Sequence, residues 1–80
     1  MKCTVKTFGI TRDITGAREV EMDVAEGATV HEFKQALFKQ YPRLSGLTSL
    51  FIAVNHAYAD DGQVLAVGDE IALIPPVAGG

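Results

Sequence analysis

The group in this chain best placed for chemistry is the α-carboxylate of Gly80, which follows Gly79. Glycine lacks a Cβ, so a Gly-Gly end adds nothing to a core but threads readily into a narrow space. A terminal carboxyl group has an ordinary pKa of about 3.5, so at neutral pH it is an anion and a poor electrophile. We expect Gly80 to react only after a partner converts one oxygen into a leaving group. The alternative interpretation is a loose chain end without a role.

The other candidate reactive groups are Cys3 and the two histidines, His31 and His56. A single cysteine excludes an internal disulfide and a cysteine metal cluster. Cys3 is in step with Val5 on an alternating segment, which favours a buried structural thiol. The histidines have no spacing that suggests shared metal ligation, so we predict no metal site.

The length and composition limit what the chain can do alone. Eighty residues form one small domain, which buries little more than about 60% of its unfolded surface and cannot enclose a deep active site. We therefore expect a non-catalytic subunit that acts on or through a partner. No apolar run approaches the roughly 18 residues of a membrane span, and no charged-then-apolar leader precedes the first strand. We expect a cytoplasmic protein without a membrane partner.

Charge is distributed unevenly along the chain. All seven lysines and arginines lie before residue 44, and the acidic residues after it are Asp60, Asp61, Asp69 and Glu70. Phosphate contacts need Lys and Arg, so nucleic acid is not the expected partner of this half. The pattern favours docking on a basic protein surface, and ordinary solvated turn acids are the alternative.

The first half of the chain predicts two strands and a helix. Residues 2–8 alternate, with Cys3, Val5 and Thr7 on one face, and residues 9–16 form a short irregular turn with room for a helical piece. Alternation over residues 19–24 predicts the second strand. Thr29 stands three residues before Glu32, a spacing typical of a capping box, and a helix should start at Val30. Its buried stripe would continue through Phe33, Leu37 and Tyr41 and end before Pro42.

The second half predicts short strands separated by turns. Residues 43–49 are expected to form a loop, and residues 50–55 a strand with a turn at Asn55-His56. Tyr58 would begin a short fourth strand, and residues 70–74 form the last one. A single amphipathic helix needs a sheet to cover, so this order predicts an α+β fold, the ubiquitin-like β-grasp. It has a mixed sheet of four to five strands, one main helix, and parallel first and last strands at the centre.

The chain would then consist of a β-grasp domain over residues 1–74 and a flexible tail over residues 75–80. An extended tail of six residues reaches roughly 18 Å. The prolines would keep its base extended and lower the ordering cost of insertion, although strand termination alone also accounts for them. The residues expected to thread into a partner are Pro75, Pro76, Val77, Ala78 and Gly79.

The end of the chain also carries a resemblance. Residues 68–80, Gly-Asp-Glu-Ile-Ala-Leu-Ile-Pro-Pro-Val-Ala-Gly-Gly, strongly resemble the end of the small, sulfur-carrying subunit of molybdopterin synthase. Ala53-Val54-Asn55, the stretch Arg-Asp-Ile-Thr-Gly at residues 12–16 and the length extend the likeness over nearly the whole chain. Related thiamine-pathway carriers also end in Gly-Gly, but their tails typically lack the diproline.

The resemblance implies a function for Gly80. An ATP-using, E1-like enzyme would adenylate its carboxylate, which is then converted to a thiocarboxylate. The tail would enter the large catalytic subunit of the synthase, in a heterotetramer, and supply sulfur for the dithiolene of molybdopterin. The chain itself would bind no cofactor. Left open are a ubiquitin-like modifier joined to lysines through Gly80, a carrier for thiamine or a tungsten cofactor, and a plain interaction domain.

Docking is expected on the sheet face opposite the helix. Phe8 and Ile74 are apolar residues at outward positions, and neighbouring central strands would bring them together. Tyr58 aligns with a third apolar position of the family's partner-binding surface, although the family more commonly has an aliphatic residue there. The predicted interface is Phe8, Tyr58 and Ile74 with the acids Asp69 and Glu70 around them. The alternative is that Phe8 covers an edge of the core.

Overall fold

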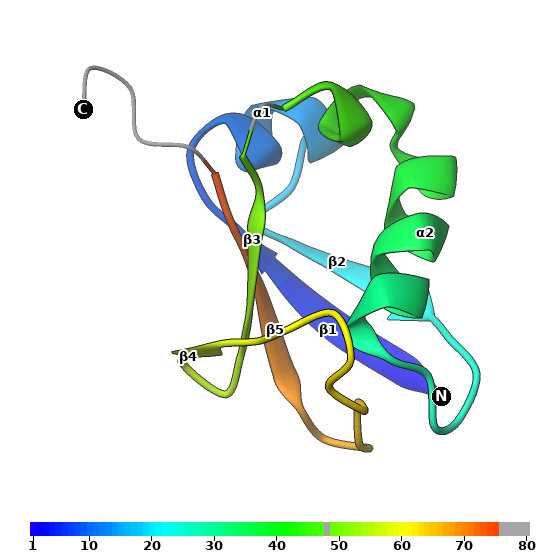
Figure 1. Ribbon diagram of the computed structural model, residues 1–80. Helices are drawn as coiled ribbons and strands as arrows, with labels where there is room; N and C mark the ends of the chain where they lie inside the picture. Colours follow the sequence, from blue (N-terminus) through cyan, green and yellow to red (C-terminus); the bar gives the residue numbers. More distant parts are fainter. Residues whose placement is uncertain (48, 76–80) are drawn as a thin grey trace.

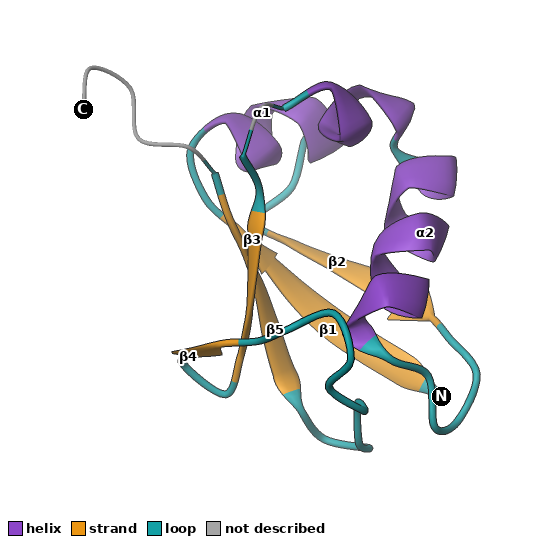
Figure 2. Cartoon of the chain, viewed as in Figure 1, coloured by secondary structure: helices purple, strands orange, loops and turns teal. Residues whose placement is uncertain are grey.

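The computed structural model describes residues 1–47 and 49–75, and within them a five-stranded mixed sheet carries its helices on one face (Figure 1). In chain order the elements are β1 (Lys2–Thr7), α1 (Ile10–Thr15), β2 (Glu19–Asp23), α2 (Val30–Gln40), the 3-10 helix η1 (Pro42–Gly46), β3 (Phe51–Val54), β4 (Ala57–Tyr58) and β5 (Glu70–Ile74). The strand order is β2-β1-β5-β3-β4, and Figure 2 shows the elements by type. This is the ubiquitin-like β-grasp that the sequence predicts.

The middle of the sheet joins segments that lie far apart in the sequence. β5 runs parallel to β1, with Val5 opposite Ile71, and antiparallel to β3, with Ile52 opposite Leu73. β2 pairs antiparallel with β1 on the other side. The prediction of parallel first and last strands is confirmed. Residue 74 therefore ends a strand that is held on both sides.

The core lies between the sheet and α2. Val30, Phe33 and Leu37 are fully buried on α2, and Val5 and Ile71 are fully buried on the facing strands. Burying a side chain of this size stabilises the fold by about 1.5–3 kcal/mol. The alternation on β1 and the helical spacing on α2 both predict these positions, because each pattern places apolar residues on a single face.

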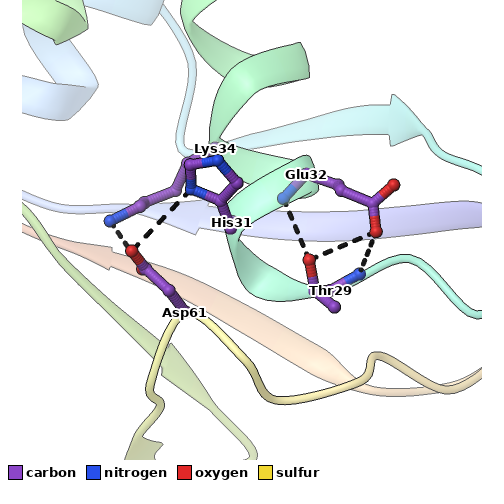
Figure 3. A network of polar contacts seen from close by, with 5 residues as sticks. All are labelled: Thr29, His31, Glu32, Lys34 and Asp61. Carbon is purple, nitrogen blue, oxygen red and sulfur yellow. Dashed lines mark hydrogen bonds and ion pairs between the residues drawn. The ribbon is translucent and has the colours of Figure 1, made fainter.

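The start of α2 is held by two sets of polar contacts (Figure 3). The Thr29 hydroxyl accepts from the Glu32 backbone N–H at 3.2 Å, and the Glu32 carboxylate accepts from the Thr29 N–H at 3.0 Å. The predicted capping box is confirmed. Beside it, Lys34 Nζ lies 2.9 Å from Asp61 Oδ1, and His31 Nδ1 lies 3.8 Å from Asp61 Oδ2. The hydrogen bond from Lys34 lowers the pKa of Asp61.

The segment after β1 differs from its predicted form. β1 ends at Thr7 rather than residue 8, because the Phe8 N–H donates to the Thr11 hydroxyl at 2.8 Å instead of to a strand. Gly9 then turns the chain with φ at +54°, a region that glycine adopts readily. The irregular turn contains a six-residue helix, α1, which ends at the left-handed Gly16.

Two further boundaries correct the prediction. Residues 43–46 of the expected loop belong to η1, since Pro42 favours the φ of a first helical turn and Leu44 is fully buried beneath it. β3 spans Phe51–Val54 rather than residues 50–55, because Asn55 and His56 both have positive φ in the turn that follows. That turn lies where the sequence predicts it, and β4 begins one residue before Tyr58.

Candidate functional site

A hollow of about 390 Å³ lies on the sheet face that does not carry α2. We call it the outer hollow. Its walls come from the turn after β1 and from β3, β4 and β5, and its lining residues are Phe8, Ala53, His56, Tyr58, Glu70, Ala72 and Ile74. A concave, mostly apolar surface with a few polar groups is typical of a binding site.

Sheet register brings the predicted apolar residues together. Thr7 lies opposite Leu73 in the parallel pair, so the next residues along, Phe8 and Ile74, reach the same end of the outer hollow. Tyr58 pairs with Ala53 across the β3–β4 hairpin and closes the hollow from the side. Phe8 is 42% exposed and Tyr58 is 73% exposed, so neither ring is buried in the core.

The sequence analysis missed a large apolar residue beside the hollow. Phe51 is 54% exposed, lies opposite Ile74 in the β3–β5 register, and has its ring centroid 5.5 Å from that of Tyr58. Aromatic pairs at this separation attract one another. Phe51 shares strand parity with Ala53, which lines the hollow, and that alternation is the signal that could have identified it. The apolar surface is therefore wider than the predicted trio.

Glu70 places a carboxylate in the outer hollow, and this carboxylate contacts two basic side chains. Its Oε1 lies 3.0 Å from Lys6 Nζ and its Oε2 lies 3.0 Å from His56 Nε2. The hydrogen bond and the positive charge of Lys6 lower the pKa of the Glu70 carboxyl group, so it is ionised at neutral pH. The sequence analysis did not identify His56 as part of this site, because the ring reaches Glu70 only through the left-handed turn after β3.

Asp69 lies outside the lining of the outer hollow and has structural partners. Its Oδ2 accepts from the Ala66 backbone N–H at 2.8 Å, and its Oδ1 accepts from Asn55 Nδ2 at 2.9 Å. These hydrogen bonds lower the pKa of Asp69, with the bond from Ala66 the larger cause. Asn55 in turn accepts from the Glu70 N–H at 3.0 Å. Of the two acids predicted around the patch, only Glu70 lines the hollow.

The base of the predicted tail adjoins the same end of the hollow. Ile74 lines the hollow, and Pro75 lies so close to Gly9 that a Cβ on Gly9 would come within 3.3 Å of Pro75 Cγ. Positive φ and this close approach together favour glycine at position 9. The remaining predicted tail residues lie outside the described part of the chain: Pro76, Val77, Ala78, Gly79 and Gly80.

Other candidate chemistry finds no support in geometry. Cys3 is 4% exposed, and burial raises the pKa of its thiol, which disfavours the reactive thiolate. Among residues 1–47 and 49–75, no three His, Cys, Asp or Glu side chains lie close enough together to hold a metal ion. In the same residues, no helix is both long enough and apolar enough to cross a membrane.

The fold defines a class, the ubiquitin-like β-grasp domains, and the outer hollow gives this member an apolar sheet face beside the end of β5. Residues 5–80 match the model of the ThiS family. The chain belongs to the ThiS family.

Known relatives agree with that assignment. The molybdopterin synthase sulfur carrier subunit of Mycobacterium tuberculosis is 40% identical over 84 residues, covering 100% of this chain and 99% of that protein. The subunit of the same name from Arabidopsis thaliana is 30% identical over 77 residues, covering 95% and 80%.

Solved structures are similar over the whole chain. The crystal structure of SAMP1 from Haloferax volcanii has a TM-score of 0.87 at 31% identity, with all of both chains covered. A chain of the complex of subunits 1 and 2 of molybdopterin-converting factor from Helicobacter pylori has a TM-score of 0.70 at 27% identity, again over all of both chains.

Proposed function

We propose that this protein is the sulfur-carrier subunit of a molybdopterin synthase and that Gly80 carries the sulfur. The observation that supports this most is the likeness to sulfur carrier subunits from two distant organisms over nearly the whole chain. The position of β5 agrees with it. A strand held on both sides ends beside a docking hollow, so a tail that starts there is delivered from a fixed point.

The chemistry proceeds in balanced steps. The Gly80 carboxylate attacks the α-phosphorus of ATP on an E1-like enzyme, forms an acyl-adenylate and releases pyrophosphate. A sulfur nucleophile at the oxidation level of sulfide then displaces AMP and leaves a thiocarboxylate. In the large subunit the thiocarboxylate sulfur attacks a carbon of the pterin precursor and displaces an oxygen substituent, which leaves with its electron pair. Water then cleaves the acyl–sulfur bond, so the sulfur stays on the pterin and the Gly80 carboxylate is regenerated. A tethered nucleophile reacts as if at very high local concentration.

The partners follow from the same proposal. The related chain from Helicobacter pylori is described in a complex of subunits 1 and 2, and we propose that this chain docks on a corresponding large subunit. The outer hollow and Phe51 are the proposed contact surface. The activating enzyme is the second partner, and a heterotetramer of two carriers and two large subunits is the proposed assembly.

Mass spectrometry tests the proposal directly. Protein isolated with its activating enzyme, ATP and a sulfur donor should gain the mass of one sulfur in exchange for one oxygen, located on Gly80. A variant with one bulky residue added after Gly80 is the matched control and should gain nothing. A sulfur found elsewhere, or cofactor production by the extended variant with its extension intact, would contradict the proposal.

A protein modifier is the second candidate, because SAMP1 of Haloferax volcanii is a small archaeal modifier protein by name. This role uses the same acyl-adenylate, but the attacking group is a lysine amine of another protein. It predicts adducts joined through an isopeptide bond to Gly80. Enrichment of a tagged chain, followed by peptide mass spectrometry, separates the two roles.

A further inference from the structure

Glu70 is the single carboxylate among the described residues that line the outer hollow. Its side chain is 36% exposed, so it is accessible from the hollow and yet partly shielded from water. An ionised carboxylate accepts hydrogen bonds at both oxygens and can receive a bidentate guanidinium. Both oxygens are occupied in this structure, one by Lys6 and one by His56.

The two contacts differ in how easily they can be replaced. Lys6 belongs to β1, near the centre of the sheet, and its side chain is 40% exposed. The side chain of His56 is 85% exposed and extends from a turn, so little packing holds it against Glu70 Oε2. A group that approaches across the hollow can therefore displace the imidazole without disturbing the sheet.

We propose that a partner fills the outer hollow with an apolar side chain and places an adjacent arginine on Glu70, where it displaces His56. This inference rests on the proposed function, because it specifies what the docking partner presents at this surface. Charge complementarity supports it: residues 60–70 contribute four carboxylates, and Lys6 is the one lysine or arginine that pairs with Glu70 within the described residues. Arginine suits the site better than lysine, since a planar guanidinium pairs with a carboxylate and also stacks on rings such as those of Tyr58 and Phe8.

His56 competes most strongly with the partner's arginine when its ring is positively charged, because a neutral imidazole donates only one hydrogen bond and no charge to Glu70. Imidazoles change charge between roughly pH 5 and 8. The ring contacts Glu70, the first residue of β5. Lys6 on β1 binds the same carboxylate, Tyr58 on β4 lines the same hollow, and Asp69, which precedes β5, binds the Asn55 side chain next to His56 in the sequence. Both carboxyl groups have lowered pKa values and remain anions throughout that range. Docking should therefore weaken as the pH falls from 8 to 6.

Calorimetric titration of the full chain into the large synthase subunit from the same organism tests this inference. Glu70→Gln should weaken binding about tenfold at low salt, because the arginine loses a charged acceptor. Wild-type binding should be about two- to fivefold weaker at pH 6 than at pH 8. This is the change in affinity that the free energy of one exposed ion pair corresponds to. His56→Gln should remove most of that pH difference, because an amide side chain does not change its charge over this pH range.

Lys6→Gln is the matched control, because it removes the other partner of Glu70 and leaves the proposed arginine site intact. If Glu70 acts only by holding Lys6, Lys6→Gln will weaken binding as much as Glu70→Gln, and the inference is wrong. It is also wrong if Glu70→Gln, shown to be folded by circular dichroism, binds as tightly as the wild type. Failure of the wild-type chain to bind the large subunit at all would instead remove the proposed partner, and this inference with it.

Discussion

Asp69 and Asn55 fasten the start of β5 to the turn that follows β3. Each of the two side chains makes two hydrogen bonds of 2.8 to 3.0 Å, counting the one that they share. The described hydrogen bonds of Asp69 thus hold the start of β5, and its place in the partner interface stays a prediction. The sequence shows an acidic residue in the Gly-Asp-Glu stretch, but it does not indicate whether that side chain contacts a partner or the backbone of its own chain.

We expect Asp69→Asn to lower the stability of the protein at neutral pH. The Asp69 carboxylate accepts from the Ala66 N–H and from Asn55 Nδ2. An asparagine amide has one oxygen that accepts and one nitrogen that only donates, so one of these two hydrogen bonds is lost. Since the folded-state pKa of Asp69 lies below its ordinary 3.8, its stabilisation is complete above that value and is lost as the pH falls through the lowered pKa. Urea unfolding at pH 7 and pH 3 should show a gap in stability between wild type and variant that is smaller at pH 3 than at pH 7.

Asp60→Asn provides the control for that experiment. The Asp60 side chain makes no hydrogen bond or ion pair within residues 1–47 and 49–75, so its replacement should leave the urea midpoint unchanged at both pH values. An equal effect of both substitutions would mean that net charge, and not the hydrogen bonds of Asp69, governs the pH dependence.

At the scale of elements, α2 depends on the contacts of its first turn. Thr29→Ala should cost about 1 kcal/mol, because it removes the hydroxyl that accepts from the Glu32 N–H. For a domain of this size that corresponds to a fall in Tm of roughly 4–8 °C, measurable by circular dichroism. Gln35→Ala, at an exposed position in the middle of α2, should change stability by less than about 0.5 kcal/mol.

Elements with a strong periodicity could be predicted from the sequence, and those stabilised by tertiary contacts could not. The alternation in β1 and β2 and the spacing of Val30, Phe33 and Leu37 each specify one buried face. In η1, by contrast, the one buried residue is Leu44. A single buried residue gives no repeating pattern from which a helix could be predicted. α1 is similarly short, and its fully buried residue is the polar Thr11.

The candidate site could be predicted in part for the same reason. Strand parity identified Phe8 and Ile74 as outward-facing apolar residues, and the outer hollow contains both. Phe51 was missed because the strand over residues 50–55 was predicted from its composition, without assigning its residues to the two faces of the sheet. His56 was missed because its approach to Glu70 depends on two consecutive residues with positive φ, a geometry that no local pattern specifies.

At the scale of the whole molecule, the fold and the proposed sulfur chemistry should be separable. Within residues 1–47 and 49–75 the last member of the core cluster is Leu73, and glycine has no side chain to bury, so removal of Gly79 and Gly80 should leave the Tm unchanged. If the proposed function is correct, the same deletion should abolish cofactor production in a strain that lacks its own carrier. Loss of the fold on this deletion would show instead that the last two residues contribute to stability.

β5 lies between β1 and β3, and this position constrains which translation products can survive. A chain that stops before residue 70 has no strand to fill the gap, so two rows of backbone donors and acceptors remain open to aggregation or proteolysis. Only a polypeptide made at least through Ile74 can close the sheet. Incomplete products should therefore fail to fold and be degraded, so that each folded domain carries β5 complete through Ile74.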